Sequence, residues 1–141
     1  MRNHPRALAN EGITPERYTE LRAICGQYPD YKRTLERARH GLVEDPRRRR
    51  SRSSAWKQPD PTGNAAAVLA DRFGWMSERV RLIEHCAREA AGSAVAPALI
   101  ESVTEGRTYD ALRHRPPCGR RFFYAVRLGF FVLLDVRLRN G

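Results

Sequence analysis

Residues 108–138 read TYDALRHRPPCGRRFFYAVRLGFFVLLDVRL, and the expected fold depends on this stretch. Its first part, Thr108–Arg113, predicts a short helix. The pair Pro116-Pro117 ends that helix, because proline has no amide hydrogen to donate and clashes with the preceding turn. A longer helix is expected to start at Cys118 or Gly119. A short helix, a tight turn and a longer helix form a helix-turn-helix, whose second helix lies in the major groove of DNA.

The longer helix is expected to have an apolar side and a basic side, at 100° per residue. The basic side carries Arg121, Tyr124 and Leu128 in the first turns, with Arg120 and Arg127 on its flanks. Arginine near the start of such a helix can pair with guanine through two hydrogen bonds. Any soluble amphipathic helix also has a charged outer face, so this helix alone leaves both interpretations open. The apolar side, expected to be buried, is formed by Phe122, Phe123, Val126, Phe130, Leu133 and Leu134.

The composition is strongly basic. The 141 residues include 26 basic and 16 acidic ones, which gives a net charge of +10, and all basic residues except Lys32 and Lys57 are arginines. The planar guanidinium group suits phosphate and guanine, so this charge favours nucleic acid as a partner. A GC-rich genome would also raise the ratio of arginine to lysine, but it would not raise the net charge.

Residues 1–43 predict an arm followed by two helices. Residues 1–13 are polar and are expected to form a flexible arm. Thr14-Pro15-Glu16 marks the start of the first helix, because threonine caps helices well, proline fits the first turn and an acid is favourable there. The second helix is expected from Pro29 to about Gly41. Since residues 27–30 separate the two helices, they predict an αα-hairpin over residues 14–43.

Residues 44–60 have no apolar periodicity and are expected to form a flexible basic linker. Repulsion between arginines and the presence of serines both favour an extended chain. Such a tract can bind phosphates or enter a minor groove, as the arms of homeodomains do, or it can be a solvated spacer. The candidate DNA-contacting residues of the linker are Arg47, Arg48, Arg49, Arg50 and Arg52.

A long helix is expected after the linker and ends at Ala91-Gly92-Ser93. Its apolar residues alternate spacings of three and four, which is the heptad pattern of a coiled coil. The same pattern fits the core face of a central helix in a bundle, and alanines at both ends favour the bundle. A further helix is expected over residues 96–104. The heptad positions are Ala66, Leu69, Phe73, Met76, Val80, Ile83, Ala87 and Ala90.

Four segments of the chain, in their order and spacing, resemble the phage and prophage transcriptional regulators of the RinA/ArpU late-activator type. Residues 28–31 (YPDY) follow the opening helix, and residues 60–65 (DPTGNA) lead into the long helix. Residues 79–84 (RVRLIE) lie within the long helix, and residues 117–124 (PCGRRFFY) start the last helix, followed by Arg127 and Phe130-Phe131. The resemblance covers most of the chain.

This resemblance implies a C-terminal helix-turn-helix similar to region 4 of sigma factors, which binds promoter DNA and activates late phage genes. It also implies that Phe122 and Val126 anchor the last helix in the core. Cys118 stands where such turns often carry serine or threonine as a helix cap. The residues that the resemblance implies as DNA-facing are Arg120, Arg121, Tyr124 and Arg127.

Other classes of function have little support in the sequence. It contains no apolar run of about 18 residues and no secretory signal at its start, so we expect a cytoplasmic protein without membrane contact. Cys25, Cys86 and Cys118 predict reduced thiols rather than disulfides. The histidines and cysteines lack the spacing of a zinc site, and no nucleophile, base and acid suggest an enzyme. We therefore expect no metal, no cofactor and no catalytic residue.

Together these features predict an all-α fold: a short N-terminal helical hairpin, a basic flexible linker, and a helical DNA-binding domain over residues 61–141 that ends in a helix-turn-helix at 108–138. The expected function is sequence-specific binding of double-stranded DNA by a regulator of phage or prophage genes. RNA polymerase and a second copy of the chain are further candidate partners. Two alternatives stay open: a DNA recogniser of phage packaging, similar to a small terminase, and an adaptor that assembles through the heptad helix over 66–90.

Overall fold

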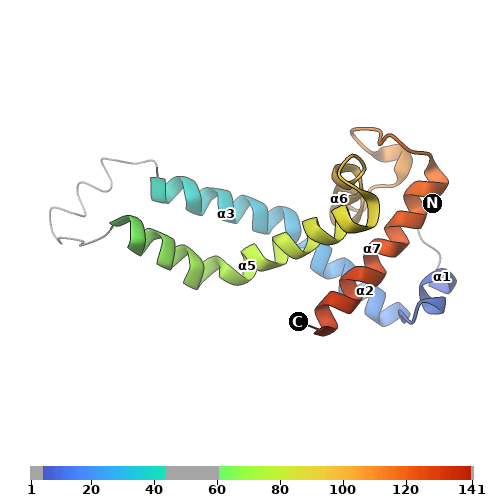
Figure 1. Cartoon of the computed structure of the whole chain (residues 1–141), viewed down its shortest axis with the longest axis horizontal. Coiled ribbons are helices and arrows are strands. Elements are labelled where there is room, and N and C mark those ends of the chain that lie inside the picture. The colour runs from blue at the N-terminus through green and yellow to red at the C-terminus, as the bar shows by residue number, and fades with distance from the viewer. Residues whose placement is uncertain (1–4, 44–60, 141) are drawn as a thin grey trace. The chain divides into compact units, whose positions relative to one another are not determined.

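The computed structural model describes residues 5–43 and 61–140, with side chains for residues 7–41 and 73–140. No strand occurs in these described residues, so the predicted all-α class is confirmed. A short 3₁₀ turn, η1 (Tyr109–Ala111), precedes the last helix. The α-helices, labelled in Figure 1, are α1 (Pro5–Asn10), α2 (Pro15–Gly26), α3 (Tyr28–Val43), α5 (Pro61–Ala91), α6 (Ala96–Glu105) and α7 (Arg120–Asn140).

The chain divides into two compact units. The terminal unit, as we call it, contains Met1–Pro29 and Val80–Gly141, and the middle unit contains Asp30–Arg79. These boundaries differ from the expected ones, because α2 belongs to the terminal unit, where it packs against α6 and α7. The basic linker that we expected over residues 44–60 lies outside the described residues, so its flexibility stays a prediction.

The connection between α2 and α3 corrects one prediction. Only Gln27 separates the two helices, and its backbone is right-handed helical, with φ −80° and ψ −16°. Its amide hydrogen is directed at the carbonyl oxygens of Ile24 and Cys25, as in the last turn of a helix. A helical hairpin needs a connecting loop of about two to five residues. The hairpin turn predicted at residues 27–30 is therefore wrong, and Pro29 stands in the first turn of α3, where proline is tolerated.

The segment before α2 corrects a second prediction, because residues 5–13 form a capped helix where we expected a flexible arm. Gly12, at φ +83°, adopts the left-handed conformation that follows many helices. Its amide hydrogen bonds to the carbonyl of Ala9, and that of Ile13 bonds to the carbonyl of Leu8. This double hydrogen bond is a Schellman motif, which brings together the side chains of the first and last residues. Leu8 and Ile13 are each only 1% exposed, so α1 is part of the core.

Other helix boundaries agree with the predicted local signals. The hydroxyl of Thr14 accepts a hydrogen bond from the amide of Arg17 at 3.1 Å, as an N-cap residue should, and Pro15 is the first residue of α2. At the end of α6, Gly106 adopts a left-handed conformation with φ +70°, and its amide bonds to the carbonyl of Ser102. These caps fix where α2 begins and where α6 ends.

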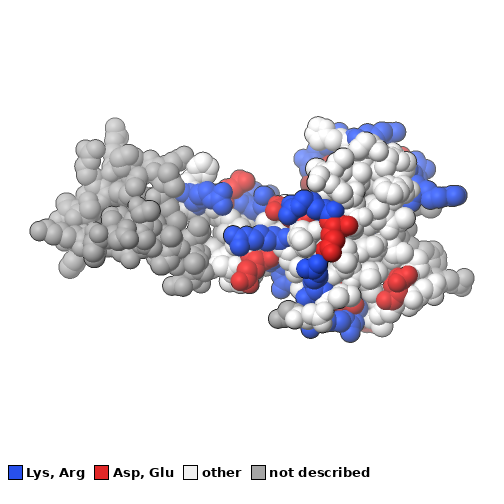
Figure 2. All heavy atoms as spheres, in the orientation of Figure 1, with Lys and Arg blue, Asp and Glu red and all other residues white. Residues whose placement is uncertain are grey.

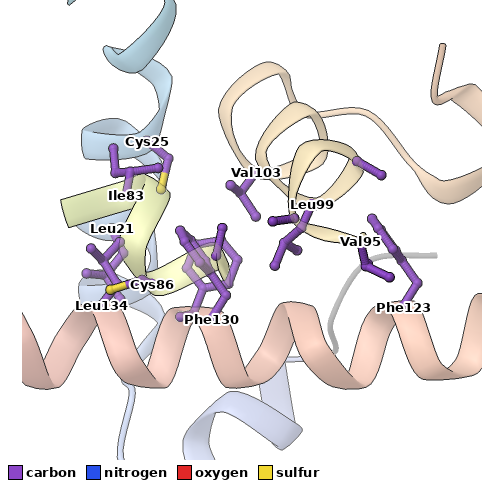
Figure 3. Packing of buried hydrophobic residues seen from close by; sticks show 14 of the residues in the cluster. Leu21, Cys25, Ile83, Cys86, Val95, Leu99, Val103, Phe123, Phe130 and Leu134 are labelled. Atoms are coloured by element: carbon purple, nitrogen blue, oxygen red, sulfur yellow. The ribbon is translucent and has the colours of Figure 1, made fainter. Parts of the chain in front are cut away.

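The core of the terminal unit is formed by side chains from α1, α2, α5, α6 and α7, and Figure 3 shows how residues of the last four pack together. Leu21 and Cys25 of α2 and Ile83 and Cys86 of α5 meet near the C-terminal half of α7. Leu99 and Val103 of α6 lie further along α7, towards Phe123. Burial raises the pKa of the Cys86 thiol to about 11, so this thiol stays protonated at neutral pH. Phe123, Phe130, Phe131 and Leu134 of α7 are fully buried.

One carboxylate connects α2 to α7. Asp135 is buried and accepts hydrogen bonds from Arg17 Nε at 2.6 Å and from Arg139 Nε at 3.0 Å. Burial by itself would raise the pKa of this carboxyl, but the two arginines outweigh it and hold the pKa below its usual range. Asp135 is therefore charged at neutral pH and contributes to the packing of α2 on α7.

The heptad positions of α5 include several that face the core of the terminal unit. Ile83 and Ala87 are buried within it, as expected for the central helix of a bundle, and Val80 is also buried. The side chains of Ala66 and Leu69 lie outside the described residues. In the middle unit, the ring of Trp75 on α5 meets that of Tyr31 on α3 edge to face, with centroids 5.2 Å apart. Ile83 and Ala87 thus belong to the chain's own core rather than to a coiled-coil seam.

Candidate nucleic-acid interface

The segment between α6 and α7 is held by Tyr109. Its amide hydrogen donates to the hydroxyl of Tyr124 at 3.0 Å, and its own hydroxyl donates to the carbonyl of Cys118 at 2.7 Å. The ring is buried and meets that of Phe123 edge to face, with centroids 5.6 Å apart. These contacts fix residues 106–119 on the first turns of α7.

This segment differs from the tight turn that we predicted. Over Thr108–Arg113 only the three residues of η1 are helical, and the α-helix that precedes α7 is α6, which ends at Glu105. A helix-turn-helix usually has a turn of about three or four residues. The first helix of the predicted motif is therefore reduced to one turn. Tyr109 in this turn donates through its amide to Tyr124 of α7 and through its hydroxyl to Cys118, just before α7.

The start of α7 is close to the predicted one. The amide of Phe123 donates to the carbonyl of Gly119 at 3.0 Å, which makes Gly119 the N-cap residue. Cys118, which we considered as a poor cap, precedes the cap and accepts the hydrogen bond from Tyr109 through its carbonyl. The amides of Arg120, Arg121 and Phe122 thus stand at the open end of the helix, where anions are favoured.

Arg120 is held by a carboxylate beside the helix start. One of its terminal nitrogens lies 2.6 and 2.7 Å from the two carboxylate oxygens of Asp110. This hydrogen bond raises the pKa of Arg120. The guanidinium groups of Arg120 and Arg115 also lie 5.8 and 5.5 Å from the centroid of the Tyr109 ring, within the range of cation–π contact. Arg120 is half exposed, so it is available to a ligand only in competition with Asp110.

Arg113 and Arg107 are neutralised by two acids of α6. Arg113 bonds through its amide and its side chain to Glu101, at 2.9 and 3.3 Å, and also to Glu105. Arg107 lies 3.3 Å from Glu101 and 3.5 Å from Glu105. Since two carboxylates balance two guanidinium groups, this cluster adds little to the positive potential of the segment.

Arg121 and Arg115 provide the uncompensated charge. Both are exposed, and no hydrogen bond or ion pair engages either side chain within the residues that the structure describes. Sequence reasoning selected Arg121 but missed Arg115, which directly precedes the double proline. The candidate interface therefore consists of Arg115, Arg120 and Arg121.

Two of the predicted DNA-facing residues are not exposed, and one predicted core residue is. Arg127 is only 5% exposed: its Nε lies 3.3 Å from the hydroxyl of Ser102, and its guanidinium stacks 5.1 Å from the ring of Phe131. Arg127 therefore lies on the buried face of α7 and not on the exposed face where we expected it. Tyr124 is half buried and accepts the hydrogen bond from Tyr109. Phe122, expected in the core, is 53% exposed.

These differences in exposure have one cause: the buried face of α7 is rotated about the helix axis relative to the predicted one. Phe123, Arg127 and Phe131 follow each other at intervals of four residues, so they share one side of the helix. Because Phe123 and Phe131 are buried, Arg127 between them is buried as well. The linker arginines Arg47, Arg48, Arg49, Arg50 and Arg52, also predicted to contact DNA, lie outside the described residues.

In the described part of the chain, no three histidine, cysteine or acidic side chains are grouped so that they could hold a metal ion. Nor does any helix in these ranges have the length and apolarity needed to cross a membrane. Comparison with family models, with curated proteins and with solved structures found no match to this chain.

Proposed function

We propose that this chain binds double-stranded DNA and regulates phage or prophage genes, as the late regulators that it resembles do. The observation that carries the proposal is a net charge of +10 from a chain whose basic residues are almost all arginines, combined with the exposed Arg115 and Arg121 near the start of α7. Neither has an acidic partner within the described residues. A protein with this charge attracts phosphate, and the sequence-independent part of DNA binding follows from that attraction.

Contact with DNA would be made by the rim of the loop and the first turn of α7. Arg121 is the best candidate for reading a base, because its guanidinium group has no partner in the part of the chain that the structure describes and could bond to guanine with two hydrogen bonds. Arg115 and the open amides of the helix start are suited to phosphate oxygens. Arg120 could add a further phosphate contact once it leaves Asp110. The preference for one base sequence would then depend on few side chains, whereas the affinity for any duplex would depend on many.

The test is fluorescence anisotropy with a set of promoter duplexes and three variants. Arg121→Ala should weaken binding to the preferred duplex by about tenfold and reduce the preference. Arg115→Ala should weaken binding to all duplexes alike and lower the slope of log affinity against log salt by about 0.9. The matched control is Arg81→Ala on α5, which removes an equally exposed arginine outside the proposed interface. If all three variants bind alike, the proposed interface is refuted.

A DNA recogniser of phage packaging would bind DNA as well, but it would assemble into rings. Light scattering of the purified protein separates the two functions by mass. We expect a mass no larger than that of a dimer, and a large ring would favour packaging over regulation.

A further inference from the structure

Helix α7 has a second apolar stripe besides the one that faces the core. It consists of Phe122, Val126, Gly129, Leu133 and Val136, and we call it the outer stripe. Its residues follow each other at alternating intervals of four and three, which is the spacing of one side of a coiled-coil helix. Sequence analysis placed Phe122, Val126 and Leu133 in the core together with Phe123, Phe130 and Leu134, but only the latter three are fully buried.

The outer stripe is open to solvent at both ends and in the middle. Phe122 is 53% and Val136 45% exposed, and both are among the most exposed large apolar side chains of the described residues. Val126 and Leu133 are half buried against the core. A methyl group placed on Gly129 would meet no atom within 4 Å, so the backbone there is open to close approach. Figure 2 shows a broad area of uncharged side chains over α7.

The charges beside the stripe indicate which partner fits it. The exposed charged residues of α7 are all arginines, namely Arg120, Arg121, Arg137 and Arg139. Within the terminal unit Asp110 bonds to Arg120, Glu89 bonds to Arg137, and Asp135 is shared by Arg139 and Arg17. Four arginines thus pair with these three carboxylates, and Arg17 also pairs with Glu20. Arg121 has no acidic partner within the described residues, so the surroundings of the stripe keep a positive excess.

A second copy of the chain fits this surface poorly. An antiparallel pair of α7 helices would set Arg121 against the Arg137 and Arg139 end of the other copy, and a parallel pair would set each arginine beside its own copy. Like charges across a helix pair oppose association, whereas opposite charges beside an apolar seam select the partner. Phe122, Val136 and the open backbone at Gly129 are the features with which an apolar helix face makes contact.

We propose that the outer stripe binds an acidic amphipathic helix of another protein. The partner's apolar residues, at heptad spacing, would cover Phe122 and Val136, and its flanking acids would lie beside Arg121 and the Arg137–Arg139 end. The apolar residues of this surface are separate from the side chains that hold the loop on α7. Arg121 is shared with the proposed DNA interface, so binding of the helix is measured in the absence of DNA and does not depend on DNA binding.

The probe is a synthetic helical peptide of three heptads, with leucine at the seam positions and glutamate at the flanking positions, and its binding is measured by anisotropy. A peptide with lysine at the flanking positions is the charge control. We expect the glutamate peptide to bind the intact chain at least about tenfold more tightly than the lysine peptide. The double variant Phe122→Ser/Val136→Ser should weaken that binding at least about tenfold, because exposed apolar anchors dominate such contacts.

The matched control variant is Val132→Ser, which makes the same change on α7 outside the stripe and should bind the glutamate peptide as the unaltered chain does. Circular dichroism checks that each variant is folded. Equal binding of both peptides, or unchanged binding by the double variant, would overturn the proposal. A dimer in sedimentation that the double variant dissociates would assign the stripe to a second copy instead, and would likewise overturn it.

Discussion

At the scale of single residues, the structure gives the arginines of α7 different roles, although the sequence presents them as one set. Arg121 is exposed and has no hydrogen-bond or ion-pair partner among the described residues, Arg120 is held by Asp110, and Arg127 is buried. An arginine is usually assigned to a surface because burial of its charge is costly. Arg127 is an exception because its guanidinium stacks on Phe131 and bonds to Ser102. Residue type alone could not distinguish these roles.

Arg127→Ala should therefore affect stability rather than DNA affinity. Removal of the buried stem and its hydrogen bonds should lower the free energy of unfolding by about 2 kcal/mol. The affinity of the folded variant for DNA should stay within about twofold of that of the unaltered chain. Urea denaturation measures the stability and fluorescence anisotropy measures the affinity for DNA. Arg121→Ala is the opposite case, because we expect this variant to be as stable as the unaltered chain but to bind DNA more weakly. A stable Arg127→Ala variant with weakened DNA binding would show that this residue faces DNA after all.

Asp135 should make the stability of the terminal unit dependent on pH. The pKa of its carboxyl is lower in the folded chain than in the unfolded one, so its contribution is complete above the unfolded pKa of about 4 and is lost as the pH falls through the folded pKa. Asp135→Asn should lower the free energy of unfolding by about 2 kcal/mol at pH 7, because Arg17 and Arg139 lose a charged acceptor.

That deficit should shrink as both proteins are unfolded in urea at successively lower pH below about 4, where the carboxyl of the unaltered chain is also protonated. Glu20→Asn is the matched control, since Glu20 is an exposed acid that also pairs with Arg17. It should cost less than about 0.5 kcal/mol. A deficit of Asp135→Asn that is constant with pH would show that the arginines do not depend on its charge.

At the scale of elements, the sequence determines helix ends better than helix faces. Thr14-Pro15 and Gly106 are local signals, because the hydrogen bonds of a cap involve only residues within one turn. The face of α7 is a different problem, since Phe122 and Phe123 are neighbours of equal apolarity and only tertiary packing selects one. In the structure Phe123 is the one selected, since it is fully buried in the core and its ring packs against that of Tyr109. Because the buried face of α7 is rotated relative to the predicted one, Arg127 leaves the exposed set of residues. The candidate site was for this reason predicted only in part.

Helix α1 was missed although its signal is local. Leu8 and Ile13 flank a glycine at the spacing of a Schellman motif, and both are buried. Leu8→Ala should lower the free energy of unfolding by about 3 kcal/mol, because it leaves a cavity in a core that is otherwise filled. Thermal denaturation measures this, and Ala7→Gly on the same short helix is the control, with an expected cost of about 1 kcal/mol or less. An unaffected melting temperature for Leu8→Ala would mean that residues 5–13 behave as the flexible arm that the sequence predicts.

At the scale of the whole molecule, the positive charge exceeds what the described interface requires. Arg115, Arg120 and Arg121 account for a small part of the 26 basic residues, and the net charge of +10 is spread over the chain. Charge of this kind raises the affinity for any duplex, whereas contacts with base edges raise it for one duplex over others. Affinity and preference should therefore respond to different residues.

Replacement of Arg47, Arg48, Arg49, Arg50 and Arg52 by glutamine separates the two effects. If these arginines bind phosphates, the variant should bind every duplex more weakly, and the slope of log affinity against log salt should fall by about 0.9 for each phosphate that is no longer neutralised. The ratio of affinities between the preferred duplex and the others should stay constant, because phosphates carry no sequence information. Arg121→Ala should show the opposite, a reduced ratio with a nearly constant slope. If the glutamine variant lowers the ratio instead, these five residues reach a groove and the recognition of base sequence is not confined to the start of α7.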